Sequence, residues 1–152
     1  LNQWIDAAVR TGTPIIASRD WHPPAHVSFK ESGGPWPEHC VQNTKGAAFH
    51  PDLDLPENAR IVEKGTRPDK DDYSAFQAID LAAELSEKGI RRLWIGGLAQ
   101  DVCVRQTSID AAKSGFETHV ILPATRPVDP EGGKKALEDM KNACVELEEA
   151  NV

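Results

Sequence analysis

Several features that mark other protein classes are missing from this chain of 152 residues. It has no run of 18 apolar residues, so no segment is predicted to span a membrane. No basic cluster exceeds two neighbouring residues, and 24 acidic against 17 basic residues give a net charge of −7. This charge distribution argues against nucleic acid or anionic lipid as the main partner.

Cysteine is scarce, and no two cysteines form a CxxC pair. The three residues, Cys40, Cys103 and Cys144, are an odd number. Such usage is typical of a reducing compartment, so we expect a cytoplasmic protein. The glycines form neither a GxGxxG nor a GxxxxGKS pattern, so the sequence does not support binding of nucleotide phosphates.

The length and composition fit one globular domain. Hydrophobic residues make up 39% of the chain and charged residues 27%, which favours a folded protein over a disordered one. A chain of this length can build one well-packed core but not two. We therefore expect residues 1–152 to form a single domain.

Apolar periodicity alternates between helix-like and strand-like segments. The alternation predicts βαβ units and hence an α/β fold of three layers, with helices on both faces of a mainly parallel sheet. Ser74 and Asp101 are expected to cap helices, and Pro123 is expected to end a strand. Helices are predicted over 1–12, 74–89, 101–115 and 131–143, and strands over 14–18, 60–65, 91–97, 116–122 and 144–147.

Residues 19–56 show no periodicity but contain four of the five histidines. A loop of this length in a compact domain is usually functional or disordered, and its four aromatic residues favour function. In parallel sheets, ligands bind beyond the carboxyl ends of the strands. Three unusual segments lie at the carboxyl ends of predicted strands, namely 19–39, 64–65 and 96–103. Together they predict a single ligand-binding site.

Cys103 lies in or just before the first turn of a helix that is entered from a glycine turn. The amide groups and positive dipole at such a helix start favour a thiolate and can bind an oxyanion. The alternative is a small buried core residue, which is the commoner role of a lone cysteine. Cys40 and Cys144 have no comparable setting and are expected to be packing residues.

Lys64 follows a predicted buried strand, where an ammonium group is costly without an anionic partner. Near a thiolate, this ammonium would stabilise the charged form. The alternative is a lysine whose stem is buried while its charge reaches water.

Asp20, His22 and His39 supply one carboxylate and two imidazoles within the long loop. Such sets of nitrogen and oxygen ligands suit zinc, iron or manganese, with positions left open for water or substrate. His26 and His50 lie nearby in the sequence, and the spacing does not exclude them. The alternative is a polar loop with solvated histidines.

Trp36 stands between two prolines, three residues before His39. An aromatic ring held in this way can stack on a flat ligand. It can equally anchor the loop to the core.

Four blocks of sequence together resemble the nicotinamidase/pyrazinamidase branch of the isochorismatase-like cysteine hydrolases. The resemblance extends from residue 1 to about 147, and the order of the four blocks makes it specific. The blocks are SRDWHPPAHVSF at 18–29, WPEHCVQ at 36–42, EKG at 63–65 and GLAQDVCV at 97–104.

The resemblance implies a role for each candidate residue. Cys103 would be the nucleophile and Lys64 the cation of an Asp-Lys-Cys triad. A divalent metal, zinc first and iron or manganese as alternatives, would be bound by Asp20, His22 and His39. Ser28 would lie beside the waters of the metal, Trp36 and Tyr73 would line the ring pocket, and a cis peptide between Leu98 and Ala99 would aim the amides of Ala99 and Cys103 at the oxyanion.

The implied activity is hydrolysis of nicotinamide, and of pyrazinamide, to the acid and ammonia through a thioester. The implied partner is therefore a small pyridine carboxamide, and a homo-oligomer is compatible with the sequence. Two alternatives stay open. One is another amide or carbamoyl hydrolase of the same fold, and the other is a non-catalytic metal-binding domain.

The chain departs from the family pattern at two places. Gln100 and Val102 stand where the family usually has threonine and an aromatic residue, which predicts a different pocket shape. The aspartate of the family's triad lies on a central strand that precedes the first helix, and Asp20 cannot replace it while binding metal. We therefore expect the natural polypeptide to carry this strand upstream of Leu1.

Overall fold

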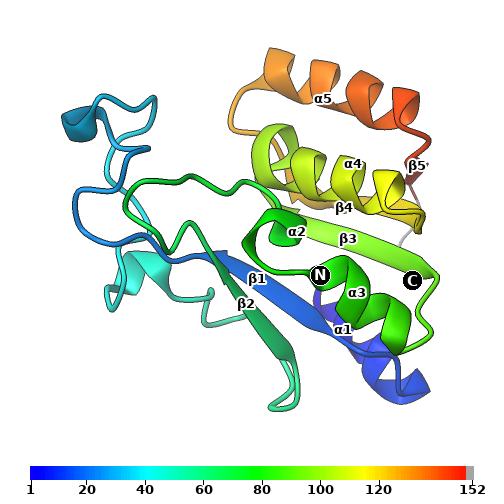
Figure 1. Ribbon diagram of the computed structural model, residues 1–152. Helices are drawn as coiled ribbons and strands as arrows, with labels where there is room; N and C mark the ends of the chain where they lie inside the picture. Colours follow the sequence, from blue (N-terminus) through cyan, green and yellow to red (C-terminus); the bar gives the residue numbers. More distant parts are fainter. Residues whose placement is uncertain (150–152) are drawn as a thin grey trace. The chain divides into compact units, whose positions relative to one another are not determined.

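The computed structural model describes residues 1–149, which form two compact units, residues 2–78 and residues 79–149, the latter including Leu1 (Figure 1). We refer to them as the N-terminal and C-terminal units. The N-terminal unit contains α1 (Asn2–Thr11), β1 (Ile16–Asp20), the 3-10 turns η1 (Lys30–Ser32) and η2 (Lys45–Ala47), β2 (Arg60–Lys64) and α2 (Ala75–Ala78). The C-terminal unit contains α3 (Leu81–Glu87), β3 (Arg92–Leu98), the π-helical turn η3 (Gln100–Val104), α4 (Arg105–Lys113), β4 (Glu117–Arg126), α5 (Pro130–Asn142) and β5 (Glu146–Glu148).

Both units combine parallel strands with α-helices, so the predicted α/β fold class is confirmed. In the N-terminal unit, β1 pairs with β2 in parallel, and the last register pair joins Asp20 to Lys64. The carboxyl ends of the two strands therefore place these side chains next to each other. Within the described residues, no helix is both long and apolar enough to cross a membrane.

The segment that follows β1 is built by its own contacts rather than by a regular element. Isolated bridges join His22 to Val41 and Phe29 to Trp36, and Phe29 is almost completely buried. A Cβ atom at Gly34 would overlap the backbone of Ser28, so only glycine fits there. The prediction of an ordered loop is confirmed, and its order comes from this local core.

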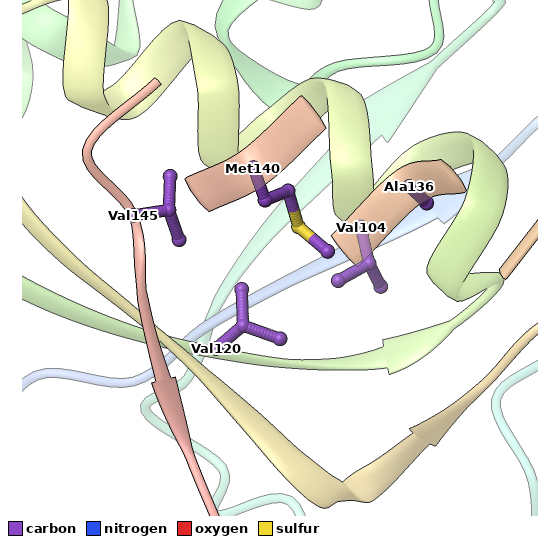
Figure 2. Packing of buried hydrophobic residues seen from close by; sticks show 5 residues of the cluster. All are labelled: Val104, Val120, Ala136, Met140 and Val145. Carbon is purple, nitrogen blue, oxygen red and sulfur yellow. The ribbon is translucent and has the colours of Figure 1, made fainter. Parts of the chain in front are cut away.

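The C-terminal unit has a parallel sheet in the order β3-β4-β5, with α4 packed against β4 and α5 against both α4 and β5 (Figure 1). Helix α5 begins at a cap in which the Asp129 carboxylate accepts from the Gly132 N–H. The apolar face of the helices meets the sheet in one buried cluster, shown in Figure 2. Its members are Val104, Val120, Ala136, Met140 and Val145.

Two predicted boundaries are wrong for identifiable reasons. The helix predicted over 74–89 is interrupted, because the Asp80 side chain accepts from the Ala83 N–H and caps a new helix. The strand predicted to end at Pro123 continues to Arg126, because the register between β3 and β4 shifts between Ile95 and Gly97. A proline is tolerated at such an irregularity because no ladder hydrogen bond needs its missing N–H.

Asp101 does not cap the next helix as predicted, because it lies inside η3. Its two carboxylate oxygens accept from the backbone N–H groups of Val128 (2.9 Å) and Asp129 (3.0 Å). Partial burial by itself would raise the pKa of Asp101, but hydrogen bonds from backbone N–H groups, those of Asp129 and Val128 and its own, hold the pKa below its usual value. Asp101 thus joins η3 to the segment that precedes α5.

Candidate functional site

The N-terminal unit brings together the three predicted metal ligands. Asp20 ends β1, His22 follows two residues later, and His39 comes from the long loop. One ligand atom from each residue lies within 4.8 Å of the ligand atoms of the other two. His50 does not join them; its exposed ring lies 3.9 Å from a carboxylate oxygen of Asp52.

Both histidines of this group are oriented through the same ring nitrogen. The Nδ1 atom of His22 lies 3.0 Å from the carbonyl oxygen of Gly65, and that of His39 lies 2.8 Å from the carbonyl of Pro37. A carbonyl only accepts, so each Nδ1 carries the hydrogen and each Nε2 is left with its lone pair. This arrangement is typical of histidines that bind metal, so the donor set fits a divalent ion.

The protonation of His22 favours the same role. Burial lowers the pKa of His22, and the nearby rings of His26 and His39 lower it further, although the Gly65 carbonyl and Asp20 act in the opposite direction. The net decrease favours the neutral imidazole, which is the form that binds a metal.

His26, which the spacing could not exclude as a ligand, supports His22 instead. Its ring stacks on that of His22 at 4.2 Å, and its own nitrogens face the Ser28 hydroxyl (2.8 Å) and the Lys70 carbonyl (3.0 Å). A ligand atom of Asp71 also lies within 4.8 Å of those of His22 and His26. Sequence reasoning missed Asp71, because no pattern relates its position to the histidines.

Lys64 has the anionic partner that its position required. The side chain is 4% exposed, and Nζ donates to Oδ1 of Asp20 and, at 3.4 Å, to the carbonyl oxygen of Asp72. The carboxylate of Asp20 therefore faces both the ammonium group and the two histidines. The ammonium group of Lys64 thus offsets the negative charge of this candidate ligand.

The two aromatic residues predicted to line a ring pocket are also brought together. Trp36 donates from Nε1 to the hydroxyl oxygen of Tyr73 over 3.1 Å, and its ring meets that of His39 edge-on at 6.5 Å. An indole, a phenol and an imidazole thus lie in one neighbourhood of the N-terminal unit.

The C-terminal unit holds the predicted nucleophile. Cys103 is half-buried in η3, directly before α4 begins at Arg105. The peptide between Leu98 and Ala99 is cis, as the family resemblance implied, and the Ala99 carbonyl accepts from the N–H groups of Val102 and Val104. Sequence reasoning placed the cysteine correctly but missed the π-helical turn, a feature frequent at functional sites.

Comparison with known proteins agrees with this geometry. The isochorismatase domain matches residues 1–151. The nicotinamidase of Acinetobacter baylyi is 40% identical over 140 residues, which cover 78% of this chain and 65% of that protein. The nicotinamidase/pyrazinamidase of Mycobacterium tuberculosis is 36% identical, with 88% of this chain and 75% of that protein covered. This chain therefore spans just under two thirds of the first relative and three quarters of the second.

Solved structures give the same result. The pyrazinamidase of Pyrococcus horikoshii in complex with zinc has a TM-score of 0.93 and 46% identity, and covers 98% of this chain and 82% of its own. PnC1 from L. infantum in complex with nicotinate has a TM-score of 0.84 and 34% identity, with 97% and 79% covered. The resemblance drawn from the four sequence blocks is confirmed, and the chain belongs to the isochorismatase domain family.

Proposed function

We propose that this protein is a metal-containing cysteine amidohydrolase that converts nicotinamide to nicotinate and ammonia, and that it also accepts pyrazinamide. The observation that carries this proposal is the convergence of Asp20, His22 and His39 on one point, with both histidines held through Nδ1. The names of the relatives support the substrate class, since several are nicotinamidases or pyrazinamidases.

The reaction begins at Cys103. Its thiolate attacks the carboxamide carbon, a C–S bond forms, and the carbonyl oxygen becomes an oxyanion that we assign to the amides of Ala99 and Cys103. The leaving nitrogen takes up a proton as the C–N bond breaks, which releases ammonia and leaves a thioester. Water then hydrolyses the thioester to the carboxylic acid and restores the thiol.

The family resemblance assigns to Lys64 the positive charge that favours the thiolate and the developing oxyanion. The family resemblance assigns the role of general base in the triad to an aspartate. The Trp36–Tyr73 pair is assigned to the substrate ring, because a flat indole stacks on an aromatic ring while the phenol offers a polar edge.

Asp20, His22 and His39 would hold the metal ion. Two imidazoles and one carboxylate with open positions favour zinc, and iron or manganese also suits this donor set. When bound, the ion supplies a positive charge and an open coordination position for the ring nitrogen of the substrate. The protein's part is to hold both histidines by hydrogen bonds at Nδ1, which leaves each Nε2 lone pair available to the ion.

Replacing Gly65 with alanine is expected to weaken zinc binding about tenfold or more, because the new Cβ would overlap the ring of His22 and disturb its hydrogen bond to the Gly65 carbonyl. Gly12→Ala is the matched control in the same unit: its φ of +68° resembles the +61° of Gly65, but no atom lies within 4 Å of the new Cβ. Both variants carry the backbone cost of alanine at positive φ, so the comparison isolates the overlap. Zinc content after dialysis measures the effect, and equal retention by the two variants would contradict it.

The proposed activity is tested by measuring ammonia release from nicotinamide by the full natural polypeptide loaded with zinc. We expect turnover of nicotinamide and pyrazinamide, with nicotinate and pyrazinoate as the acids formed. Ammonia release from aliphatic amides or carbamoyl compounds, with none from nicotinamide or pyrazinamide, would favour another amide or carbamoyl hydrolase of the same fold. Zinc binding with no hydrolysis of any amide would favour the non-catalytic domain.

We also propose a cytoplasmic location and a small-molecule partner. The odd number of cysteines supports the first, and complexes of relatives with nicotinate and nicotinaldehyde support the second. A homo-oligomer stays compatible with the sequence.

A further inference from the structure

A second cluster of metal-ligating side chains lies on the sheet of the C-terminal unit, on residues that the proposed reaction does not use. His119 on β4 is the register partner of Glu146 on β5, and Glu148 lies two residues further along β5. Because side chains alternate along a strand, Glu146 and Glu148 point to the same face. Their carboxylates both reach the same ring nitrogen, with Nδ1 of His119 lying 2.7 Å from Oε1 of Glu148 and 3.6 Å from Oε2 of Glu146.

These distances are close to those of a zinc site. One ligand atom from each of the three residues lies within 4.8 Å of the other two. Ligands about 2.1 Å from a tetrahedral zinc ion are roughly 3.4 Å from one another. The 3.6 Å separation already matches, and the 2.7 Å separation requires the Glu148 carboxylate to retreat by less than an ångström. Glu146, whose side chain is 68% exposed, can adjust freely.

The histidine of this cluster is held by an outer shell of the kind that supports metal ligands. Its second nitrogen, Nε2, lies 3.1 Å from Oε1 of Glu117, which in turn accepts from Nε of Arg92 over 2.6 Å. The ring stacks on Trp94 at 5.1 Å with an angle of 18° and is only 6% exposed. Nδ1 faces the Glu148 carboxylate and donates its hydrogen there, and a bound metal would take the place of this hydrogen while Glu117 keeps hold of Nε2.

The charges of the cluster favour a dication. Three carboxylates face one guanidinium and one imidazole, which leaves two excess negative charges when the imidazole is neutral. A divalent ion would balance this excess and would replace the hydrogen between Nδ1 and Glu148. The cluster also differs from a simple group of surface carboxylates, because it contains a buried imidazole whose Nε2 is hydrogen-bonded to Glu117.

We propose that His119, Glu146 and Glu148 form a second binding site for a zinc-type divalent cation, which joins β5 to β4. Glu117 is a positioning residue that acts through His119. The site is distinct from Asp20, His22 and His39, and its occupancy would stabilise the end of the sheet rather than take part in the hydrolysis of the amide.

The test uses the full chain carrying His22→Ala and His39→Ala, which removes the other donor set. Equilibrium dialysis against Zn²⁺, with elemental analysis of the retained metal, is expected to give one ion per chain. Adding Glu146→Gln and Glu148→Gln should weaken this binding by at least about tenfold. Glu117→Gln, which leaves all three ligands in place, should weaken it about 10–100-fold. Glu149→Gln, an exposed residue just beyond β5 with the same charge change, should leave it unaltered.

Two results would overturn the proposal. One is the absence of zinc binding by the background chain while circular dichroism shows that it is folded. The other is zinc binding that survives Glu146→Gln and Glu148→Gln unchanged, which would place the ion elsewhere. If the background chain does not fold, the otherwise unaltered protein is used, and loss of its second equivalent of zinc on Glu146→Gln and Glu148→Gln decides the question in the same way.

Discussion

Replacing Cys103 with alanine is expected to abolish ammonia release from nicotinamide, with kcat lowered by about 10⁴-fold or more. Alanine cannot form the thioester, so the covalent route disappears while the rest of the chain is retained. The substitution removes one sulfur atom from a half-buried position in η3, and we expect the variant to fold. Steady-state ammonia release measures the loss, and unaltered zinc content and circular dichroism show that it is chemical rather than structural.

Cys144→Ala is the control for this prediction. Cys144 is exposed and has a positive φ of 62°, and alanine carries the same Cβ as cysteine, so the replacement adds no backbone strain. We expect unchanged turnover. Activity that persists in Cys103→Ala would eliminate the thiolate mechanism, and equal losses in both variants would indicate a general effect of removing cysteine.

The second large effect is expected for Asp20→Asn, which should both abolish tight zinc binding and destabilise the protein by about 3 kcal/mol. The substitution removes a ligand charge and also removes the carboxylate that accepts from the buried Nζ of Lys64. Burying an ammonium group without its ion-pair partner is strongly unfavourable, because little water replaces the lost interaction. Metal content and the free energy of unfolding in urea measure the two effects separately.

A double variant separates the two roles of Asp20. In Asp20→Asn with Lys64→Met, the buried cation is gone as well, so we expect most of the lost stability to return while zinc binding stays lost. Asp52→Asn, which changes a highly exposed aspartate of the same unit, should alter neither quantity. If Asp20→Asn keeps its zinc, Asp20 is not a ligand; if the double variant is no more stable than the single one, the ion pair does not explain the loss.

Much of the fold could be predicted because its signals are local. The stripe of apolar residues before Gly12 predicted α1, and the strand predicted over 60–65 matches β2 to within one residue. The failures also have local causes that compete with periodicity. Asp80 captures the N–H of Ala83 and interrupts a helix, and an irregular register lets β4 pass through Pro123.

In the candidate site, too, some residues have a signal in the sequence and others do not. Residue types and their places after predicted strands made Cys103, Lys64, Asp20, His22 and His39 candidates, and the family resemblance gave each of them a predicted role. Their supporting partners could not be predicted. The carbonyls of Gly65 and Pro37 and the carboxylate of Asp71 carry no signal in the sequence, since any residue offers a carbonyl and acidic residues are common.

The sequence by itself determined the fold class, the family and the residues that carry the proposed chemistry, because these depend on periodicity and on short motifs. Only the tertiary structure decided how those residues are oriented and paired. It paired Lys64 with Asp20, oriented both histidines by hydrogen bonds at Nδ1, and assembled the cluster of His119, Glu146 and Glu148 from two strands. The physical reason is that orientation and pairing arise from strand register and from backbone atoms distant in sequence, and these become neighbours only when the chain has folded.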